Sequence, residues 1–172
     1  APLLNLHRLT PREVLDAGLA IEAPLASREG FVRQLLGWRE FVRHVHRETD
    51  GFRTLGVGAE RNALQLHGVP GTLDSGAAPN FLDARTPLPS AYWGTASGLA
   101  CLDHVVADVW REGWSHHITR LMVLANIATL LDVDPRALTD WFWVAYVDAF
   151  DWVVEPNVLA MGTFATGDVM TT

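Results

Sequence analysis

The segment GWSHHITRLMV, residues 113–123, carries two adjacent histidines and an arginine inside a run that is otherwise apolar. Ser115 is a good N-cap, so we expect a helix to begin there. His117 and Arg120 are three residues apart and lie side by side on such a helix, whereas His116 points about 100° round its axis. A group that exchanges protons near neutral pH then stands beside a permanent cation on an apolar wall, which indicates a polar site. A packed or solvated histidine fits the same pattern.

Helix signals dominate the chain, and the alternation typical of strands is nearly absent. The predicted helices run from Thr10 to about Ala20 with the capping box Thr10-Pro11-Arg12-Glu13, from Ser27 to about Glu48, from Ser97 to Arg111, from Ser115 to about Leu131, and from Asp134-Pro135 to about Asp148 or beyond. Residues 51–96 are rich in Gly, Pro, Ser, Thr and Asn, so we expect a loop-rich connection with at most a turn or two of helix. After Pro156 we expect loop. The fold class is therefore all-α, an irregular bundle of five or so helices.

Composition limits the class of protein. The chain has 172 residues, of which 49% are hydrophobic, enough for one domain or one lobe of a larger one. No segment stays apolar for the ~20 residues of a membrane span. A single cysteine and an N-terminus without the order of a signal peptide favour the cytosol. The net charge of −7 argues against a uniformly basic nucleic-acid surface but allows a local basic groove. The seven tryptophans can form core, stack on flat ligands or relay electrons.

Three segments, GWREFVRH (37–44), WSHHITRLMVLAN (114–126) and DWFWVAYVDAFDWVVEPNVLAMG (140–162), resemble the flavin-binding helical domain of the photolyase and cryptochrome family. More narrowly, they resemble the bacterial branch that carries an iron-sulfur cluster and includes prokaryotic (6-4) photolyases. The resemblance extends over nearly the whole chain. It implies that residues 1–172 are part of an FAD-binding helical domain of a bacterial cytoplasmic protein. The α/β antenna domain of the family is absent from this sequence.

The resemblance also implies a cofactor site. Arg120 and Asp148 match the arginine and aspartate that hold the polar edge of FAD in the family. A buried arginine needs a carboxylate partner or an anionic ligand, so the pairing is also sensible on physical grounds. The implied cofactor-binding set comprises Arg39, Trp114, His117, Arg120, Asp148 and Asp151. For Arg39 the alternative is an exposed cation paired to Glu40.

His117 matches the histidine that donates a proton to the lesion in (6-4) photolyases, a task suited to an imidazole near neutral pH. Photolyases that repair cyclobutane dimers usually have asparagine at this position, so the histidine pair favours (6-4) chemistry. Leu121 stands where other (6-4) enzymes have a second histidine, as it does in the bacterial branch. Trp38 matches a residue that stacks on the damaged bases, and ordinary core is its alternative.

Trp93 and Trp141 match aromatic residues that relay electrons to the flavin in the bacterial branch. A role in the core is compatible with relay, because a buried tryptophan can do both. The other tryptophans, Trp110, Trp143 and Trp152, are interpreted as packing.

Cys101 matches the first ligand of the family's 4Fe-4S cluster. A cubane cluster takes four thiolates, and the other three lie beyond the last residue of this chain in the family. The chain alone therefore cannot ligate a cluster, whereas a natural protein that continues past Thr172 with a Cys-x-x-Cys and a further Cys is expected to do so. Taken alone, Cys101 is expected to be a small buried hydrophobe near a helix start.

Two departures from the family concern the flavin. The branch commonly places a glutamate near flavin N5, where this chain has Val154, and the carboxylate follows one residue later at Glu155. Either the backbone presents Glu155 to the flavin, or photoactivation differs from the family pattern. In addition, the Ser- and Thr-rich segment that cradles the flavin phosphates in the family would precede residue 1.

Three functions follow from these observations. The first is a light-driven DNA photolyase, a carbon-carbon lyase that repairs (6-4) photoproducts in UV-damaged DNA by electron transfer from reduced FAD. The second is a cryptochrome-type blue-light photoreceptor that binds FAD without repair, and the third is a cofactor-free helical interaction module. His117, Arg120 and Trp38 favour the first, whereas the acidic charge and Val154 favour the second or third. A basic groove around His117 would distinguish a DNA-repair enzyme from a photoreceptor.

Overall fold

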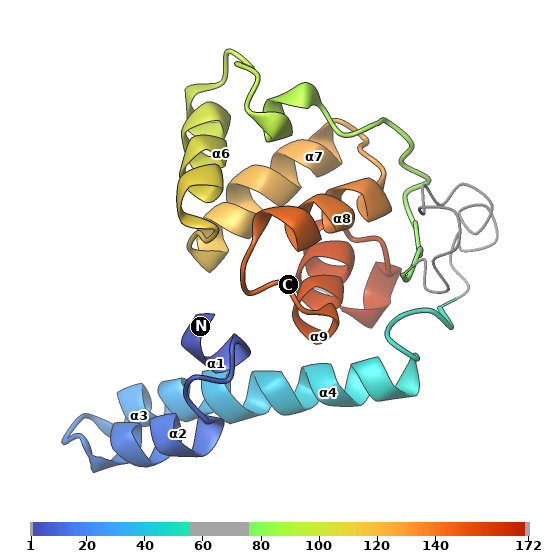
Figure 1. Ribbon diagram of the computed structural model, residues 1–172. Helices are drawn as coiled ribbons and strands as arrows, with labels where there is room; N and C mark the ends of the chain where they lie inside the picture. Colours follow the sequence, from blue (N-terminus) through green and yellow to red (C-terminus); the bar gives the residue numbers. More distant parts are fainter. Residues whose placement is uncertain (1, 56–75, 171–172) are drawn as a thin grey trace.

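The computed structural model describes residues 2–55 and 76–170, and over these residues the protein is all-α. Two groups of helices pack against each other, the N-terminal group below and the C-terminal group above in Figure 1. The N-terminal group consists of α1 (Pro2–Asn5), α2 (Pro11–Ala20), α3 (Leu25–Val32), the π-helical η1 (Arg33–Gly37) and α4 (Trp38–Glu48). The rest comprises η2 (Ser90–Trp93), α6 (Ala100–Glu112), η3 (Thr119–Ala125), α7 (Asn126–Leu130), α8 (Pro135–Ala145), α9 (Asp151–Val154), η4 (Glu155–Gly162) and η5 (Gly167–Val169). The described residues contain no strand, only an isolated bridge between Thr86 and Val133.

Two predicted helix starts are confirmed because each depends on contacts within one turn. The Glu13 N–H donates to Thr10 Oγ1 at 3.2 Å, and the Glu13 carboxylate accepts the Thr10 N–H at 2.7 Å, which is the capping box of α2. Asp134 accepts the N–H groups of Arg136 and Ala137 at the start of α8. Local capping chemistry therefore sets both of these boundaries.

Three other predicted helix starts were wrong, and at Ser115 the reason is a tertiary contact that competes for the capping side chain. Ser115 does not cap, because its Oγ is hydrogen-bonded to the Tyr146 hydroxyl at 2.8 Å; His116 Nδ1 accepts the Ile118 N–H instead. The helix predicted from Ser27 begins two residues earlier, after Pro24. The helix predicted from Ser97 begins at Ala100, since the Ser97 N–H and hydroxyl both bind Asp103.

The C-terminal segment is helical where a loop was predicted. Pro156 is the second residue of η4, which continues α9 without a break, so this proline lies inside a helix whose hydrogen bonding changes to the π pattern. The helix predicted to reach Asp148 ends at Ala145, and α9 begins after a short turn. Within the predicted loop, 56–75 lie outside the described residues, and the described remainder holds only the short helix η2, as expected.

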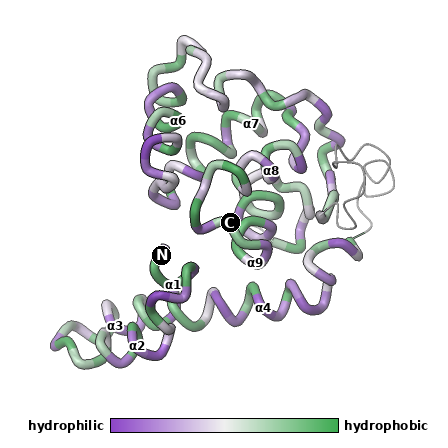
Figure 2. Tube along the Cα trace, viewed as in Figure 1, coloured by the Kyte–Doolittle hydropathy of each residue, from purple (hydrophilic) through white to green (hydrophobic). Residues whose placement is uncertain are grey.

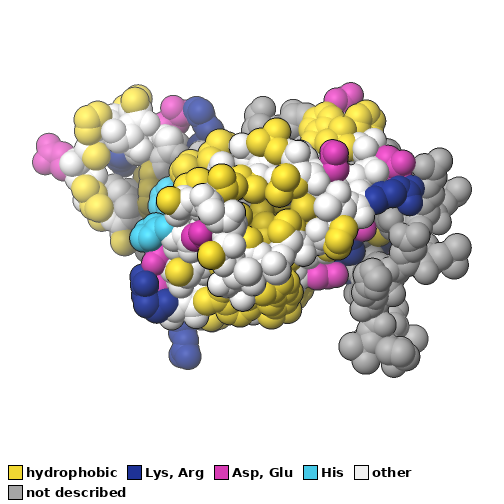
Figure 3. Space-filling model, turned by 90° about the horizontal axis from the view of Figure 1, so that it is seen from above, with side chains coloured by type: hydrophobic (Ala, Val, Ile, Leu, Met, Phe, Trp, Pro, Cys, Tyr) yellow, Lys and Arg dark blue, Asp and Glu magenta, His cyan; other side chains and the backbone are white. Residues whose placement is uncertain are grey.

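The core has two parts, and hydrophobic residues recur on the inward sides of the helices in Figure 2. The larger part packs around Trp141, Phe142 and Tyr92, and the smaller joins Val42 of α4 to Leu159 of η4. Hydrophobic side chains also gather on the face seen in Figure 3, with charged groups scattered among them. None of the helices in the described part of the chain is long and apolar enough to cross a membrane.

Candidate functional site

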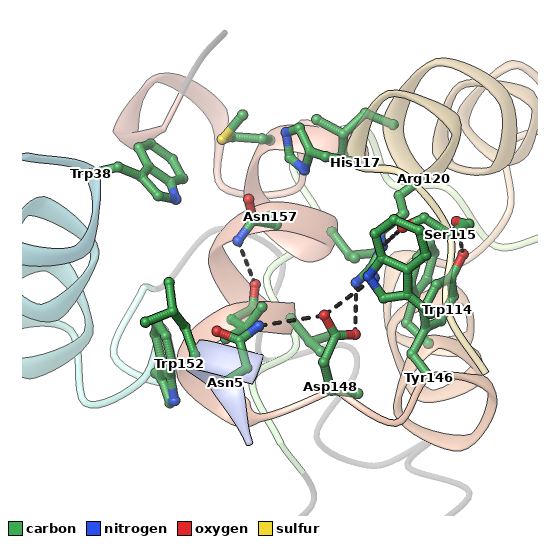
Figure 4. A pocket seen from close by; sticks show the side chains of 18 of the residues that line it. Asn5, Trp38, Trp114, Ser115, His117, Arg120, Tyr146, Asp148, Trp152 and Asn157 are labelled. Atoms are coloured by element: carbon green, nitrogen blue, oxygen red, sulfur yellow. Dashed lines mark hydrogen bonds and ion pairs between the residues drawn. The ribbon is translucent and has the colours of Figure 1, made fainter. Parts of the chain in front are cut away.

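A cavity of about 440 Å³ lies between the two groups of helices, within the size range of small-molecule sites. Its walls come from α1, η1, α4, η3, α8, α9, η4 and the connections that follow α6 and α8. Figure 4 shows aromatic rings around it and polar side chains pointing inward. The residues that line it include Asn5, Trp38, Arg39, Trp114, Ser115, His117, Arg120, Phe142, Tyr146, Asp148, Trp152, Val154 and Asn157.

All three π-helical segments of the described residues contribute to this cavity. Gln34 comes from η1, Arg120 from η3, and Asn157 from η4. A π turn inserts one extra residue into a helix and is frequently found at functional sites. Periodicity of 3.6 residues does not reveal such turns, so the sequence did not predict them.

The centre of the site is a doubly hydrogen-bonded ion pair. Arg120 Nη1 donates to Asp148 Oδ1 at 3.0 Å and Nη2 to Oδ2 at 3.2 Å, while Nε donates to the Ser115 carbonyl at 3.0 Å. The guanidinium carbon lies 4.2 Å from the centre of the Tyr146 ring. The side chain of Asp148 is 1% exposed and that of Arg120 is 13% exposed. This planar arrangement orients both groups while leaving the cavity side of the pair open.

Two further residues complete the surroundings of the pair. Asn5 Nδ2 donates to Asp148 Oδ2 at 3.4 Å, which connects the N-terminal helix α1 to the pair. Burial raises the pKa of Tyr146 to about 12, although its hydrogen bond with Ser115 acts in the opposite direction. The hydroxyl therefore remains protonated across the physiological pH range.

His117 lies in the cavity wall near Arg120, and His116 is not part of the lining, as the helix geometry predicted. The His117 ring makes no hydrogen bond with the described residues, so both nitrogens are free for a ligand. Partial desolvation, followed by the charges of Arg120 and His116, lowers the pKa of His117. The imidazole is therefore mainly neutral near pH 7.

Trp38 and Arg39 form the wall on the N-terminal side. The Arg39 guanidinium lies over the Trp152 ring, 4.5 Å from its centre, and burial lowers the pKa of Arg39. Glu40 pairs with Arg43 at 2.8 Å, so the alternative of an Arg39–Glu40 pair is not found. Trp152, which was interpreted as packing, is part of the cavity wall.

Val154 faces the cavity, and the neighbouring carboxylate does not. Glu155 is buried against Arg136, with Arg136 Nη1 at 2.8 and 3.1 Å from its two oxygens. Asn157 is the polar residue of η4 in the lining, and its Nδ2 donates to the Val153 carbonyl at 2.6 Å. The backbone therefore does not present Glu155 to the cavity. The amide oxygen of Asn157 points toward the cavity instead (Figure 4).

Several predicted site residues lie elsewhere. Asp151 faces His46, with 2.9 Å between its Oδ2 and His46 Nε2, and does not line the cavity. Trp141 lies directly behind the lining residue Phe142, and Trp93 is at the surface. Cys101 is exposed, so the expectation of a buried residue was wrong.

The described residues do not fit a metal cluster. Among them, no group of three or more His, Cys, Asp or Glu side chains could hold a metal ion. Cys101 near the start of α6 supplies a single exposed thiol, and a cubane cluster takes four.

Sequence reasoning missed Asn5, Ser115, Tyr146, Trp152 and Asn157 as cavity residues. Asn5 belongs to a helix of four residues, which carries no periodic signal. Asn157 lies next to Pro156, in the segment that was predicted as loop. A signal did exist for Tyr146, because an aromatic ring two residues before Asp148 can lie beside the arginine that Asp148 binds.

No protein-family model matches the chain. A (6-4) photolyase of Agrobacterium fabrum is 35% identical to it over 150 residues, which cover 87% of this chain. This identity supports the photolyase/cryptochrome family. The matched part is 25% of the length of the Agrobacterium protein. An uncharacterized protein of Acanthamoeba polyphaga mimivirus is 37% identical over 51 residues, 30% of this chain and 42% of that protein.

Proposed function

We propose that the cavity binds the flavin of FAD and that the chain serves light-driven repair of (6-4) photoproducts in UV-damaged DNA. The observation that carries this proposal is the Arg120–Asp148 pair, held in plane and open to a cavity with aromatic walls. The (6-4) photolyase of Agrobacterium fabrum supports it at the level of the family. In this proposal an antenna domain belongs to the same natural chain, in a bacterial cytoplasm.

The lining residues fit a flavin by their chemistry. A flavin ring is flat and apolar on its faces, and one edge presents both carbonyl acceptors and an N–H donor. Arg120 supplies N–H groups, Asp148 supplies an acceptor, and the rings of Trp38, Trp114 and Trp152 supply flat apolar walls. When bound, the cofactor supplies the light-driven one-electron chemistry, and the protein supplies binding and orientation.

His117 is the proton donor in this proposal. Its ring nitrogens are free, and it lies across the cavity mouth from Trp38 in Figure 4. Partial desolvation and then the charge of Arg120 lower the pKa of His117, so negative charge that arrives on a lesion beside it raises that pKa again. The imidazole therefore gains a proton from solvent when the lesion carries an extra electron and can then transfer it to the lesion.

The mouth of the cavity is suited to a damaged base that has flipped out of the DNA duplex. Ile118 and Met122 lie near His117 in sequence and expose 55% and 58% of their surface. Apolar groups of this kind stabilise a flat, unstacked base, and Trp38 offers it a ring.

A cryptochrome-type photoreceptor is the second candidate, because Val154 cannot exchange a proton and Glu155 is bound to Arg136. The two candidates differ in their dependence on His117. His117→Ala is expected to abolish light-driven repair of a (6-4) oligonucleotide while flavin stays bound, and His116→Asn, which keeps a side chain that can accept the Ile118 N–H, is the matched control. Full repair by the His117 variant would exclude the assigned role, and absence of repair in the unmodified protein would favour the photoreceptor.

A further inference from the structure

The corner that follows α4 has an unusual backbone. Asp50, Gly51 and Phe52 are consecutive and all lie in the left-handed region, with φ angles of 47°, 61° and 67°. Glycine adopts this region freely, whereas the large side chain of Phe52 makes it a strained position. Phe52 is fully buried in the part of the core that joins α4 to η4. Such strain persists only where the surrounding contacts hold it, and it is frequent at functional sites.

The corner is held by hydrogen bonds that also bring two cationic side chains together. The Gly51 N–H donates to the His46 carbonyl at 2.7 Å, and Thr49 Oγ1 accepts the Phe52 N–H at 2.9 Å. A side-chain carbon on Gly51 would collide with the Arg53 guanidinium and lie 3.1 Å from His46 Nε2. Glycine at this position therefore allows the side chains of His46 and Arg53 to approach each other.

Both of these side chains face the first residue of α9. His46 Nε2 lies 2.9 Å from Asp151 Oδ2, and Arg53 Nη1 lies 3.7 Å from the same oxygen. Each of the three side chains is about two-thirds buried. Because α4 belongs to the N-terminal group of helices and α9 to the C-terminal group (Figure 1), His46, Arg53 and Asp151 form a polar junction between the two groups.

The polar junction connects the elements that form two walls of the cavity. Residues 152–154 follow Asp151 directly and line the cavity from α9, whereas Trp38 and Arg39 line it from the first turn of α4. The two walls meet where the Arg39 guanidinium lies over the Trp152 ring. A contact that fixes α9 against α4 therefore also fixes the distance between these walls.

We infer that the polar junction holds the two walls of the cavity together and thereby slows the release of bound flavin. This inference rests on the proposed function. His46, Arg53 and Asp151 do not line the cavity, so they are positioning residues that act through α4 and α9. Without the junction the walls separate more often, and a flavin between them escapes sooner, so the change falls mainly on the dissociation rate.

The experiment measures FAD release from the loaded chain by stopped-flow fluorescence after dilution. His46→Ala and Asp151→Ala should each raise the dissociation rate constant about fivefold, with little change in the association rate constant. The double variant should release FAD no faster than either single variant, because each one already breaks the same contact. His46→Gln, whose amide can donate to Asp151, should restore slow release. His44→Ala, at an exposed position of the same helix, is the matched control.

The design separates positioning from a general loss of folding. Alanine keeps the His46 carbonyl that the Gly51 N–H binds, so the corner itself is retained. A variant that merely unfolds more easily would have a lower urea midpoint and bind less flavin, but its folded fraction would release FAD at the unmodified rate. Release from His46→Ala as slow as from the control, or additive effects in the double variant, would overturn the inference.

A second measurement tests the junction in the flavin-free chain. Spin labels on the exposed Cys101 of α6 and on Ala17→Cys of α2 report the distance between the two groups of helices by pulsed electron paramagnetic resonance. We expect a narrow distance distribution in the otherwise unmodified chain and a broader one with His46→Ala. Equally narrow distributions would overturn the inference. Broadening in a chain that binds no flavin would support the junction and overturn the proposed function.

Discussion

Two buried arginine–carboxylate pairs lie in the C-terminal helices, and they differ in what surrounds them. Arg136 and Glu155 are 7% and 1% exposed, and Arg136 also binds Asp140 at 2.8 Å and the Ala77 carbonyl at 2.9 Å. Arg120 and Asp148 are similarly buried, but one side of that pair faces the cavity. The first pair has its polar atoms satisfied by the protein, whereas the second leaves capacity for a ligand. Burial of an ion pair alone therefore does not distinguish a structural pair from a binding site.

The largest expected effect is on folding, and it concerns the Arg136–Glu155 pair, which the protein encloses. Arg136→Met leaves Glu155 buried without its cation, so the free energy of unfolding should fall by about 3–5 kcal/mol in urea titrations. Arg12→Met removes an exposed pair with Asp16 and should change it by no more than about 0.5 kcal/mol. If the two variants unfold alike, the structural role of Arg136 is wrong.

A change in the Arg120–Asp148 pair, which faces the cavity, should affect FAD binding more than folding. Asp148→Asn keeps the shape of the side chain and lets Arg120 retain the Ser115 carbonyl and the Tyr146 ring. We expect a smaller loss of stability, about 1–3 kcal/mol, and at least about tenfold weaker FAD binding in fluorescence titrations. Asp140→Asn, a change at the enclosed pair, is the control and should leave FAD affinity unchanged. Equal affinity in all three proteins would remove the distinction between the pairs.

The smallest expected effect is on the pH dependence of stability. Since the folded-state pKa of His117 is lowered, the unfolded chain binds a proton that the folded chain does not as pH falls below the ordinary histidine value of 6.5. His117 therefore lowers stability in acid, and the effect disappears above that pH. His117→Gln should flatten the pH dependence of urea unfolding between pH 5 and 7, relative to His116→Gln. A steeper acid dependence in His117→Gln would reverse the sign assigned to this residue.

Local chemistry explains which parts of the fold were predictable. Thr10 and Asp134 cap their helices through contacts within one turn, so sequence pattern was sufficient. Ser115 has the same capping potential, but Tyr146, 31 residues away, takes its hydroxyl. Competition of this kind depends on the completed fold and leaves no trace in local spacing.

The candidate site likewise contains some residues that the sequence could predict and others that only the fold reveals. The side-by-side placement of His117 and Arg120 followed from helix geometry, whereas Asp148 was predicted from the family resemblance. Asn5 reaches the cavity from a helix of four residues, too short for a periodic pattern, and Trp152 from the start of the continuous stretch α9–η4, part of which was predicted as loop. The contact of His46 with Asp151 joins two helices, and only tertiary structure reveals it.

Equilibrium dialysis of the unmodified chain against FAD in the dark, followed by the visible absorption spectrum, tests the flavin site directly. We expect flavin bands that stay with the protein at one equivalent and are shifted from those of free FAD. Asp148→Asn dialysed in parallel should retain less flavin at the same concentration. A colourless unmodified protein would contradict the flavin site and leave the helical interaction module as the remaining interpretation.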